Sequence, residues 1–314
     1  MAKNMYQKRE ERKNKSEETV NSEQNSTKTN INWYPGHMVK AQNDIKENLK
    51  LIDIVVEVLD ARIPISSQNP IIDKLALNKA RIIVLNKADL ADDTITKTWK
   101  LKFEKEGISC IVINAVICDN IKKLINEICI KGEAVYKEKY KNRNIEIAIK
   151  PIYRVLIVGI PNVGKSTIIN KIAKRPVTNV GNKPGVTKKK QWIRVAGNID
   201  LLDTPGLLWP RLDNEDAGLK LALTGNIKKE VLDIEELAIE GLRLLTAHDK
   251  YSAMICDKYS LSDEDIALEP YYLLEVIGKK RGCIISGGKV DMEKAGSLFV
   301  DDLKNGKIGR ITLE

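Results

Sequence analysis

The stretch GIPNVGKS, residues 159–166, determines the fold class of this 314-residue chain. It fits the pattern G-x-x-x-x-G-K-[ST], in which glycines let backbone N–H groups surround phosphate oxygens and the dipole of the following helix favours anions. The apolar run 153–158 predicts a strand that enters this loop, and residues 165–173 predict a helix that leaves it. The sequence therefore predicts a phosphate-binding loop within an α/β domain.

Residues of this loop divide the contacts to a nucleotide and its metal ion. Lys165 is expected to reach the β- and γ-phosphates, and the Ser166 hydroxyl is expected to ligate Mg²⁺. The other residues expected to contact the nucleotide here are Asn162, Val163, Gly164 and Thr167.

A second motif, Asn86-Lys87-Ala88-Asp89, selects the base. It follows the predicted strand 81–85, at the strand end where such sheets bind ligands. The Asp89 carboxylate can accept hydrogen bonds from N1–H and the exocyclic amine of guanine, whereas adenine offers neither donor. Asn86 can contact the guanine edge and tie neighbouring loops together, and the Lys87 stem can lie over the ring. The motif therefore predicts GTP or GDP as the ligand.

A weaker motif supports the same base. The pair Asn114-Ala115 follows the predicted strand 110–113, where GTPases carry a Ser-Ala pair whose backbone N–H binds guanine O6. The match is loose, but Asn114-Ala115 is expected to make the same contact.

Two segments after the phosphate loop have the pattern of switches that sense the γ-phosphate. Asp203-Thr-Pro-Gly206 follows the predicted strand 199–202, so Asp203 is expected to hold Mg²⁺ through water and the Gly206 N–H to sense the γ-phosphate. Thr187 is the candidate second Mg²⁺ ligand and would be ordered only when the γ-phosphate is present. Residues 183–194 contain no acidic residue and several basic ones, so this switch is also a candidate RNA contact.

The order of these motifs differs from that of ordinary GTPases. In those proteins the phosphate loop comes first, followed by the threonine switch, D-x-x-G, N-K-x-D and Ser-Ala. Here N-K-A-D at residue 86 and Asn-Ala at residue 114 precede the phosphate loop. The sequence therefore predicts a circular permutation, which is feasible because domain termini often lie close together.

Three regions follow from the composition. Residues 1–30 are polar and charged and are expected to form a disordered tail. In residues 31–210, alternating strand and helix patterns predict the permuted GTPase domain, with a mainly parallel sheet covered by helices on both faces. Residues 211–314 are expected to form a mainly helical domain, with helix predicted over 216–246 and continuing to about residue 280.

Charge and cysteine content restrict the partners and the compartment. The net charge is +9, and residues 1–210 carry +14 against −5 for the remainder, which favours an anionic partner or a solvated lysine-rich surface. Five cysteines without a C-x-x-C pair argue against a zinc site and favour a reducing, cytoplasmic location. No apolar run is long enough to span a membrane, so a membrane is not an expected partner. DNA is not an expected partner either.

These motifs in this order resemble those of the circularly permuted GTPases, and particularly the bacterial ribosome biogenesis GTPases. The stretches that narrow the resemblance are Trp33–Met38, Asp60–Pro64, Asp203–Pro210 and Leu221–Ile227. The resemblance runs from about residue 31 into the C-terminal region. It implies GTP hydrolysis stimulated by the large ribosomal subunit, a late step in the maturation of that subunit, contact with ribosomal RNA, and an RNA-binding role for the helical domain.

The resemblance also implies catalytic roles. Leu207 and Leu208 stand where Ras-like GTPases place a glutamine that orients the attacking water. The family instead nominates the histidine of the Trp-x-Pro-Gly-His-Met stretch, His37, which would otherwise only fill a turn. Asn162 resembles the asparagine that holds K⁺ in potassium-activated GTPases, and the alternative is a side chain that stabilises the loop. His37, Lys165 and Thr187 are thus the candidate catalytic residues.

Two other classes of function remain open at this point. The first is a GTP-dependent signalling switch that binds a protein effector. The second is an RNA-binding module in which GTP is only structural. Co-sedimentation with ribosomal subunits and GTP turnover stimulated by them would separate these classes from an assembly factor.

Overall fold

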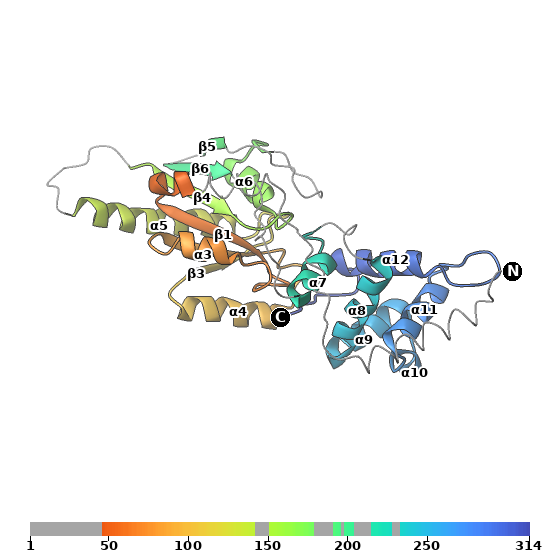
Figure 1. Cartoon of the computed structure of the whole chain (residues 1–314). Helices are drawn as coiled ribbons and strands as arrows, with labels where there is room; N and C mark the ends of the chain where they lie inside the picture. Colours follow the sequence, from red (N-terminus) through yellow and green to blue (C-terminus); the bar gives the residue numbers. More distant parts are fainter. Residues whose placement is uncertain (1–45, 142–150, 179–190, 196–197, 204–214, 228–232) are drawn as a thin grey trace, which may run out of the picture. The chain divides into compact units, whose positions relative to one another are not determined.

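The computed structural model describes residues 46–141, 151–178, 191–195, 198–203, 215–227 and 233–314. The described strands form one six-stranded sheet in the order β3-β2-β1-β4-β6-β5 (Figure 1). The strands are β1 Ile54–Asp60, β2 Ala80–Asn86, β3 Ser109–Val112, β4 Tyr153–Val158, β5 Gln191–Val195 and β6 Ile199–Asp203. Neighbouring strands are parallel except β5 and β6, which are antiparallel. The predicted mainly parallel sheet is confirmed.

The strand order is compatible with the rotated order of the motifs. From β1 the chain runs outward through β2 to β3, then returns to β4 beside β1 and runs outward to β6 and β5 on the other side. Strands β1, β2 and β3 form one half of the sheet and are consecutive in the sequence, and strands β4, β5 and β6 form the other half. Reversing the order in which the two halves occur along the sequence therefore leaves the strand order of the sheet unchanged. The circular permutation predicted from the motifs fits this topology.

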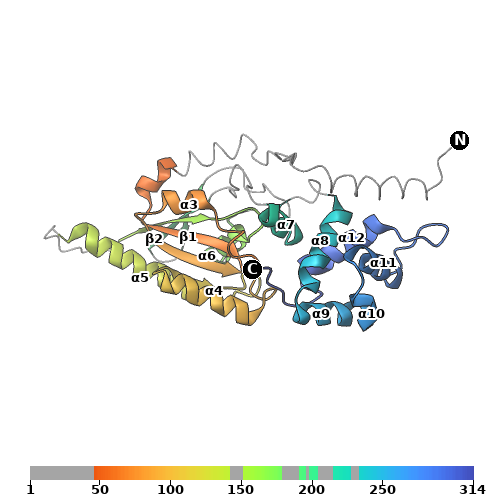
Figure 2. The same cartoon turned by 60° about the horizontal axis from the view of Figure 1, so that its bottom comes forward.

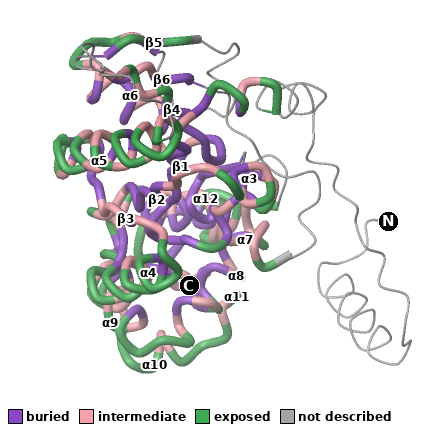
Figure 3. The backbone as a smooth tube through the Cα atoms, turned by 90° about the vertical axis from the view of Figure 1, so that its left-hand side faces the viewer, coloured by how far each residue is buried: buried purple, intermediate pink, exposed green. Residues whose placement is uncertain are grey.

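Helices cover both faces of the sheet, because the central strands are mainly apolar and are buried along most of their length (Figure 2). These helices are α3 Pro70–Leu75, α4 Asp93–Lys105, α5 Ile121–Tyr140 and α6 Lys165–Ala173. Ile83 and Leu85 of β2 cluster with Phe103 of α4. The alternate residues of β2, Ile82 and Val84, belong to the cluster that contains Leu124 and Ile128 of α5. Figure 3 shows the central strands β1 and β2 mostly buried and the outer surfaces of α4 and α5 exposed.

The described part of the chain beyond the sheet is mainly helical. Its helices are α7 Glu215–Leu223, α8 Ile234–Thr246, α9 Asp249–Tyr259, α10 Asp263–Ile266, α11 Pro270–Lys280 and α12 Met292–Lys304. Asp233 and Asp291 begin α8 and α12 by accepting backbone N–H groups of the first turn. Gly296 of α12 lets the two helices approach closely, because a Cβ there would lie 2.9 Å from the Ile234 carbonyl oxygen.

The predicted helical region is confirmed in outline, with two differences. The segment predicted as helix over 216–246 is two helices, because a turn at Thr224–Ile227 ends α7 and contacts the sheet domain. Helix also continues past residue 280, where α12 follows a short turn region.

Several predictions lie outside the described residues. These are the tail 1–30 and the domain boundaries at residues 31 and 210. Among the described helices, none has the length and apolar character to cross a membrane. The five cysteines all lie in described ranges and are free thiols.

Candidate nucleotide site

The candidate site lies at the carboxyl ends of β1, β4, β2 and β6. The strand order reverses between β1 and β4, and ligands of open α/β sheets bind at such a switch point. The phosphate loop follows β4, the N-K-A-D motif begins at the end of β2, and Asp203 ends β6. The sheet topology therefore brings together motifs that are far apart along the chain.

The phosphate loop needs glycine at two positions, because other chain segments approach it closely. Gly159 has a φ of 149°, and a Cβ there would lie 2.4 Å from the Val58 carbonyl oxygen of β1. Gly164 has a φ of 102°, and a Cβ there would lie 2.2 Å from Asn86 Nδ2. Side chains would be strained at both angles and would displace these neighbours. The motif glycines thus hold the loop against β1 and the base-selecting motif.

Lys165 begins α6 and is buried at the centre of the loop. Its Nζ donates to the carbonyl oxygens of Gly159 at 3.1 Å and Ile160 at 2.9 Å. Burial lowers the pKa of Lys165 to about 8, against the opposing effect of the Asp203 charge. The ammonium group therefore lies inside the loop that the sequence assigns to the phosphates.

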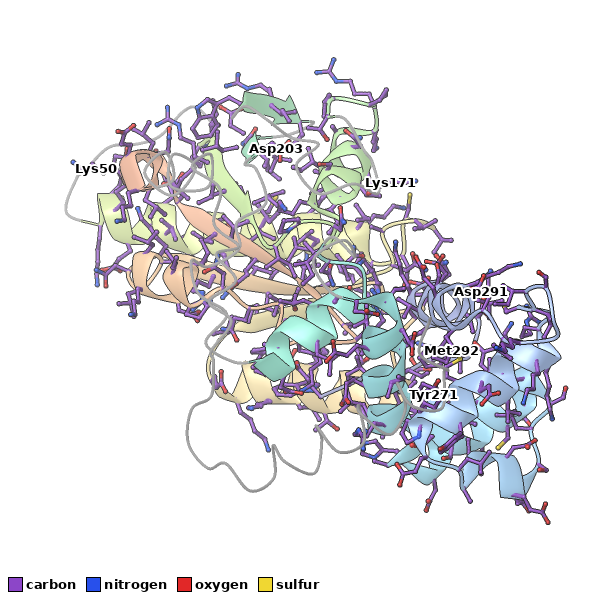
Figure 4. The ribbon with its side chains drawn as sticks, turned by 45° about the vertical axis from the view of Figure 1, so that its right-hand side comes forward. Lys50, Lys171, Asp203, Tyr271, Asp291 and Met292 are labelled. Carbon is purple, nitrogen blue, oxygen red and sulfur yellow. The ribbon has the colours of Figure 1, made fainter. Side chains whose placement is uncertain are left out.

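Two residues of the predicted magnesium site lie in the described part of the chain. Ser166 is in the first turn of α6, and the fully buried Asp203 ends β6, as labelled in Figure 4. Hydroxyl and carboxylate oxygens are the ligands that Mg²⁺ prefers, so this donor set fits the ion. The predicted Thr187 and Gly206 contacts, and His37, lie outside the described residues.

Asn86 joins the phosphate loop to the base-selecting loops. Its Nδ2 donates to the Val163 carbonyl oxygen at 2.8 Å, and its Oδ1 accepts the Ala115 N–H at 3.1 Å. The Asn114 side chain in turn accepts the Val116 N–H at 2.9 Å. The loop-tying role expected of Asn86 is present. Of the Asn114-Ala115 pair, which is expected to offer a backbone N–H to guanine O6, the Ala115 N–H is bonded to Asn86 in this conformation.

The Asp89 carboxylate is exposed at the edge of the site. Within the described ranges of the chain, no hydrogen bond or ion pair engages it. This is the arrangement expected of a group that must accept two hydrogen bonds from a ligand.

Lys87 is held by a residue that the motifs did not single out as functional. Its Nζ donates to Asp60 Oδ2 at 2.8 Å, and Asp60 ends β1 with no exposed surface. Arg62 binds the same carboxylate, with Nε at 2.9 Å from Oδ1 and Nη2 at 2.8 Å from Oδ2. Burial alone would raise the pKa of Asp60, but the charges of Arg62 and Lys87 outweigh it and hold the pKa well below its usual range.

Arg62 and Asp60 also contact the helical region. Arg62 donates to the carbonyl oxygens of Thr224 at 2.9 Å and Lys304 at 3.0 Å. Asn226 Nδ2 donates to Asp60 Oδ2 at 3.1 Å. The sequence signal was the stretch Asp60–Pro64, an acid and a base directly after a buried strand.

The phosphate loop reaches the same turn. Asn162, in the left-handed region with a φ of 58°, donates from Nδ2 to the Gly225 carbonyl oxygen at 3.0 Å. The turn Thr224–Asn226 therefore contacts both the phosphate loop and the Asp60–Arg62 pair.

Comparisons with known proteins show which family this chain resembles. Residues 154–265 match the family model described as 50S ribosome-binding GTPase. The chain is 44% identical over 287 residues to ribosome biogenesis GTPase A of Bacillus cereus. The aligned region covers 90% of this chain and 93% of that protein. It is 35% identical to the Thermotoga maritima protein of the same name, and the aligned region covers 90% of this chain and 94% of that protein. The GDP-bound structure of TM YlqF matches with a TM-score of 0.61 at 30% identity and covers 86% of this chain and 98% of that one.

The similarity covers 90% of this chain in the Bacillus cereus protein and 86% in the solved structure, so it is not confined to the phosphate loop. A phosphate loop alone occurs in many nucleotide-binding proteins, whereas a similarity of this extent includes the rotated motif order and the helical region. This chain belongs to the ribosome biogenesis GTPase A family of circularly permuted GTPases.

Proposed function

We propose that this GTPase binds the large ribosomal subunit or its precursor and uses GTP binding and hydrolysis to drive a late step of its assembly. Ribosomal RNA is the proposed contact, and the cytoplasm is the proposed location. The matched family model is described as a 50S ribosome-binding GTPase, and the curated relatives are named for ribosome biogenesis. Both names support this partner.

One observation carries the proposal: the phosphate loop is bonded to the helical region. Asn162 of the loop donates to the Gly225 carbonyl oxygen, and Arg62 beside the base-selecting motif donates to the Thr224 and Lys304 carbonyl oxygens. A nucleotide that changes the conformation of the phosphate loop must either break these bonds or bind with a lower affinity because it keeps them. This linkage suits a protein whose helical region binds a large particle in a nucleotide-dependent way.

Residues of the site have the following proposed roles. Lys165 and the loop N–H groups bind the β- and γ-phosphates, and Asp89, Lys87 and Asn86 bind guanine. The remaining base contact is assigned to Asn114 and Ala115, and the further phosphate contacts to Val163, Gly164, Thr167 and Gly206. Ser166, Thr187 and Asp203 would hold Mg²⁺, which supplies charge neutralisation between the phosphates.

Two further roles concern the chemical step. His37 is proposed to position the attacking water, because the leucines after the D-T-P-G motif cannot hydrogen-bond water. Asn162 is proposed to hold K⁺ beside the β/γ bridge, where a cation stabilises the charge that develops in the transition state. His37→Ala should lower turnover far more than GTP affinity, and equal turnover would contradict the role of His37. Asn162→Ala should abolish any advantage of K⁺ over Na⁺ in turnover.

The deciding experiment measures GTP turnover of the full chain with and without purified large ribosomal subunits and their precursors, in K⁺ buffer. Strong stimulation supports the assembly role. Tight GTP binding with no response to either particle would overturn it in favour of an effector-binding switch or a structural nucleotide. Replacing Lys188, Lys189 and Lys190 together by Ala should weaken GTP-dependent binding to the particle, whereas unchanged binding would exclude the basic switch as an RNA contact.

A further inference from the structure

The last residues of the chain return to the loop that carries Asp89. Arg310 Nη2 donates to the Ala88 carbonyl oxygen at 2.6 Å, and its Nε donates to the Ala91 carbonyl oxygen at 2.9 Å. The same guanidinium pairs with Asp93, with Nη2 at 2.6 Å from Oδ1. One side chain thus binds the base-selecting loop on both sides of Asp89.

The backbone after Arg310 continues this contact. The Ile311 N–H donates to the Leu90 carbonyl oxygen at 3.0 Å, and the Thr312 hydroxyl accepts the Asp92 N–H at 3.0 Å. Together with Arg310, these bonds engage polar backbone groups of four of the residues in 88–92. The exposed Asp89 carboxylate projects from a loop whose neighbouring backbone is held by residues 310–312.

The far end of this segment is anchored elsewhere in the protein. The Glu314 carboxylate accepts the N–H groups of Ile65 at 2.7 Å and Ser66 at 3.1 Å. The Glu314 carbonyl oxygen accepts Trp99 Nε1–H of α4 at 3.1 Å, and Figure 1 marks the C-terminus beside this helix. These contacts fix the C-terminal residues to two separate elements of the sheet domain.

The segment is also bonded to the helical region. The Tyr251 hydroxyl of α9 donates to the Thr312 carbonyl oxygen at 3.0 Å and accepts the Thr312 N–H at 3.1 Å. Lys250 of the same helix pairs with Asp92 on the base-selecting loop. The position of α9 and the position of the Asp89 loop are therefore linked through residues 310–314 as well as directly.

We propose that residues 310–314 are a positioning element for guanine recognition, with Arg310 as its central residue. A carboxylate that must meet both N1–H and the exocyclic amine needs to be held within about 0.5 Å and 10–20° of the productive geometry. The loop 88–92 lies between β2 and α4, and its own backbone bonds include those from the Ala88 N–H to Ile113 and from the Leu90 N–H to Lys87. The C-terminal segment adds bonds to the carbonyl oxygens of Ala88, Leu90 and Ala91, which those bonds do not fully restrain. This proposal rests on the proposed role of Asp89 in binding guanine.

The linkage predicts a reciprocal effect. Since α9 and the Asp89 loop share the C-terminal segment, a particle that shifts α9 changes guanine affinity, and a bound guanine nucleotide changes affinity for the particle by the same factor.

The test measures the Kd of GDP and of inosine diphosphate, which lacks the exocyclic amine, by calorimetry on the full chain. Arg310→Ala should weaken GDP binding about tenfold, reduce the preference for GDP over inosine diphosphate, and leave the kcat of GTP hydrolysis within about twofold. Arg310→Lys should fall between wild type and Arg310→Ala, because an ammonium group keeps the charge but lacks the spread N–H groups with which the guanidinium reaches Ala88, Ala91 and Asp93 together. Arg281→Ala, which removes another exposed arginine of the helical region, is the matched control and should change none of these values.

The preference ratio separates positioning from a purely structural role, because partial unfolding lowers the affinity for both nucleotides equally. Thr312→Val removes the bond to the Asp92 N–H without changing charge and should reduce the same ratio. An unchanged ratio in Arg310→Ala and Thr312→Val would overturn the proposal.

A separate variant tests the assumption about Asp89. Asp89→Asn can donate to the C2 oxygen of xanthine, so it should lose GDP affinity and gain affinity for xanthosine diphosphate. If Asp89→Asn leaves GDP binding unchanged, the proposed role of Asp89 fails. If Asp89→Asn switches the base and the Arg310 variants do not alter the ratio, the positioning proposal fails alone.

Discussion

The Lys87 ammonium group donates to the Asp60 carboxylate at 2.8 Å, although Lys87 belongs to the base-selecting motif and Asp60 to the neighbouring strand. Arg62 completes the arrangement with two bonds to the same carboxylate. The buried Asp60 carboxylate therefore pairs with two cations. Of these, Lys87 belongs to the base-selecting motif and Arg62 also binds the helical region. The end of β1 thereby organises contacts on both sides of the nucleotide site.

Replacing Asp60 should be among the most destabilising single changes in the protein. Asp60→Asn leaves the buried Arg62 and the partly buried Lys87 without their counter-charge, and such a loss costs about 3–5 kcal/mol of unfolding free energy. The depressed pKa of Asp60 means that its contribution is present above the unfolded-state pKa of 3.8 and is lost as the pH falls below it. The difference between wild type and variant, measured by urea unfolding, should therefore narrow from pH 5 to pH 3.

The exposed residue Glu106 provides the control for this measurement, since Glu106→Gln should leave the unfolding free energy unchanged. A difference between wild type and Asp60→Asn that stays constant from pH 7 to pH 3 would show that the Asp60 charge does not stabilise the fold.

The features of this site that could be predicted from the sequence are those formed by residues close together along the chain. The strand, loop and helix at residues 153–173 follow from local patterns, and the structure confirms them. The bond from Arg62 to Lys304 joins residues 242 positions apart, and that from Arg310 to Ala88 joins residues 222 apart. A local pattern of apolar and polar residues cannot predict which residues pair across such separations. The motifs therefore identified the residues expected to bind the nucleotide, whereas the contacts that hold those residues in place could be found only in the structure.

Arg62 should not be replaceable by lysine. Its planar group binds Asp60 with two bonds and also reaches the Thr224 and Lys304 carbonyl oxygens, and an ammonium group cannot make this set of bonds. Arg62→Lys should lower the unfolding free energy by about 2–4 kcal/mol and speed amide exchange in the turn Thr224–Ile227. The measurements are urea unfolding and hydrogen exchange followed by mass spectrometry.

A matched arginine lies on the surface of the sheet domain. Arg194 also binds a carboxylate, that of Asp200, through two bonds, but it is exposed. Arg194→Lys should leave both measurements unchanged because solvent screens an exposed pair. Equal effects of the two replacements would contradict the special role of the buried pair.

Asn86 should affect nucleotide affinity and stability together. Asn86→Ala leaves the Val163 carbonyl oxygen and the Ala115 N–H without their partner, which costs about 1–3 kcal/mol for each group that stays buried. Because both groups lie in loops of the nucleotide site, the Kd of GDP should rise by roughly tenfold or more. Calorimetry and urea unfolding on the same samples test this.

Asn120→Ala, at the start of α5, is a control that should leave the Kd unchanged. A normal Kd in Asn86→Ala would show that the loops keep their positions without the Asn86 side chain.

The buried Glu57 should make stability depend on pH near neutrality. Burial raises the pKa of Glu57 to about 7 despite the opposing charge of Arg81, whose Nη2 lies 2.8 Å from Oε2. A folded-state pKa above the unfolded value of 4.5 gives stability that is full below pH 4.5 and is lost as the pH rises through 7. Unfolding free energy measured from pH 5 to pH 8 should therefore fall by up to about 3 kcal/mol from this group. Glu57→Gln should flatten that slope, whereas Glu106→Gln, which alters an exposed carboxylate outside the ion pairs of Arg81, should preserve it. Parallel pH curves for wild type and Glu57→Gln would show that Glu57 stays ionised beside Arg81 throughout this range.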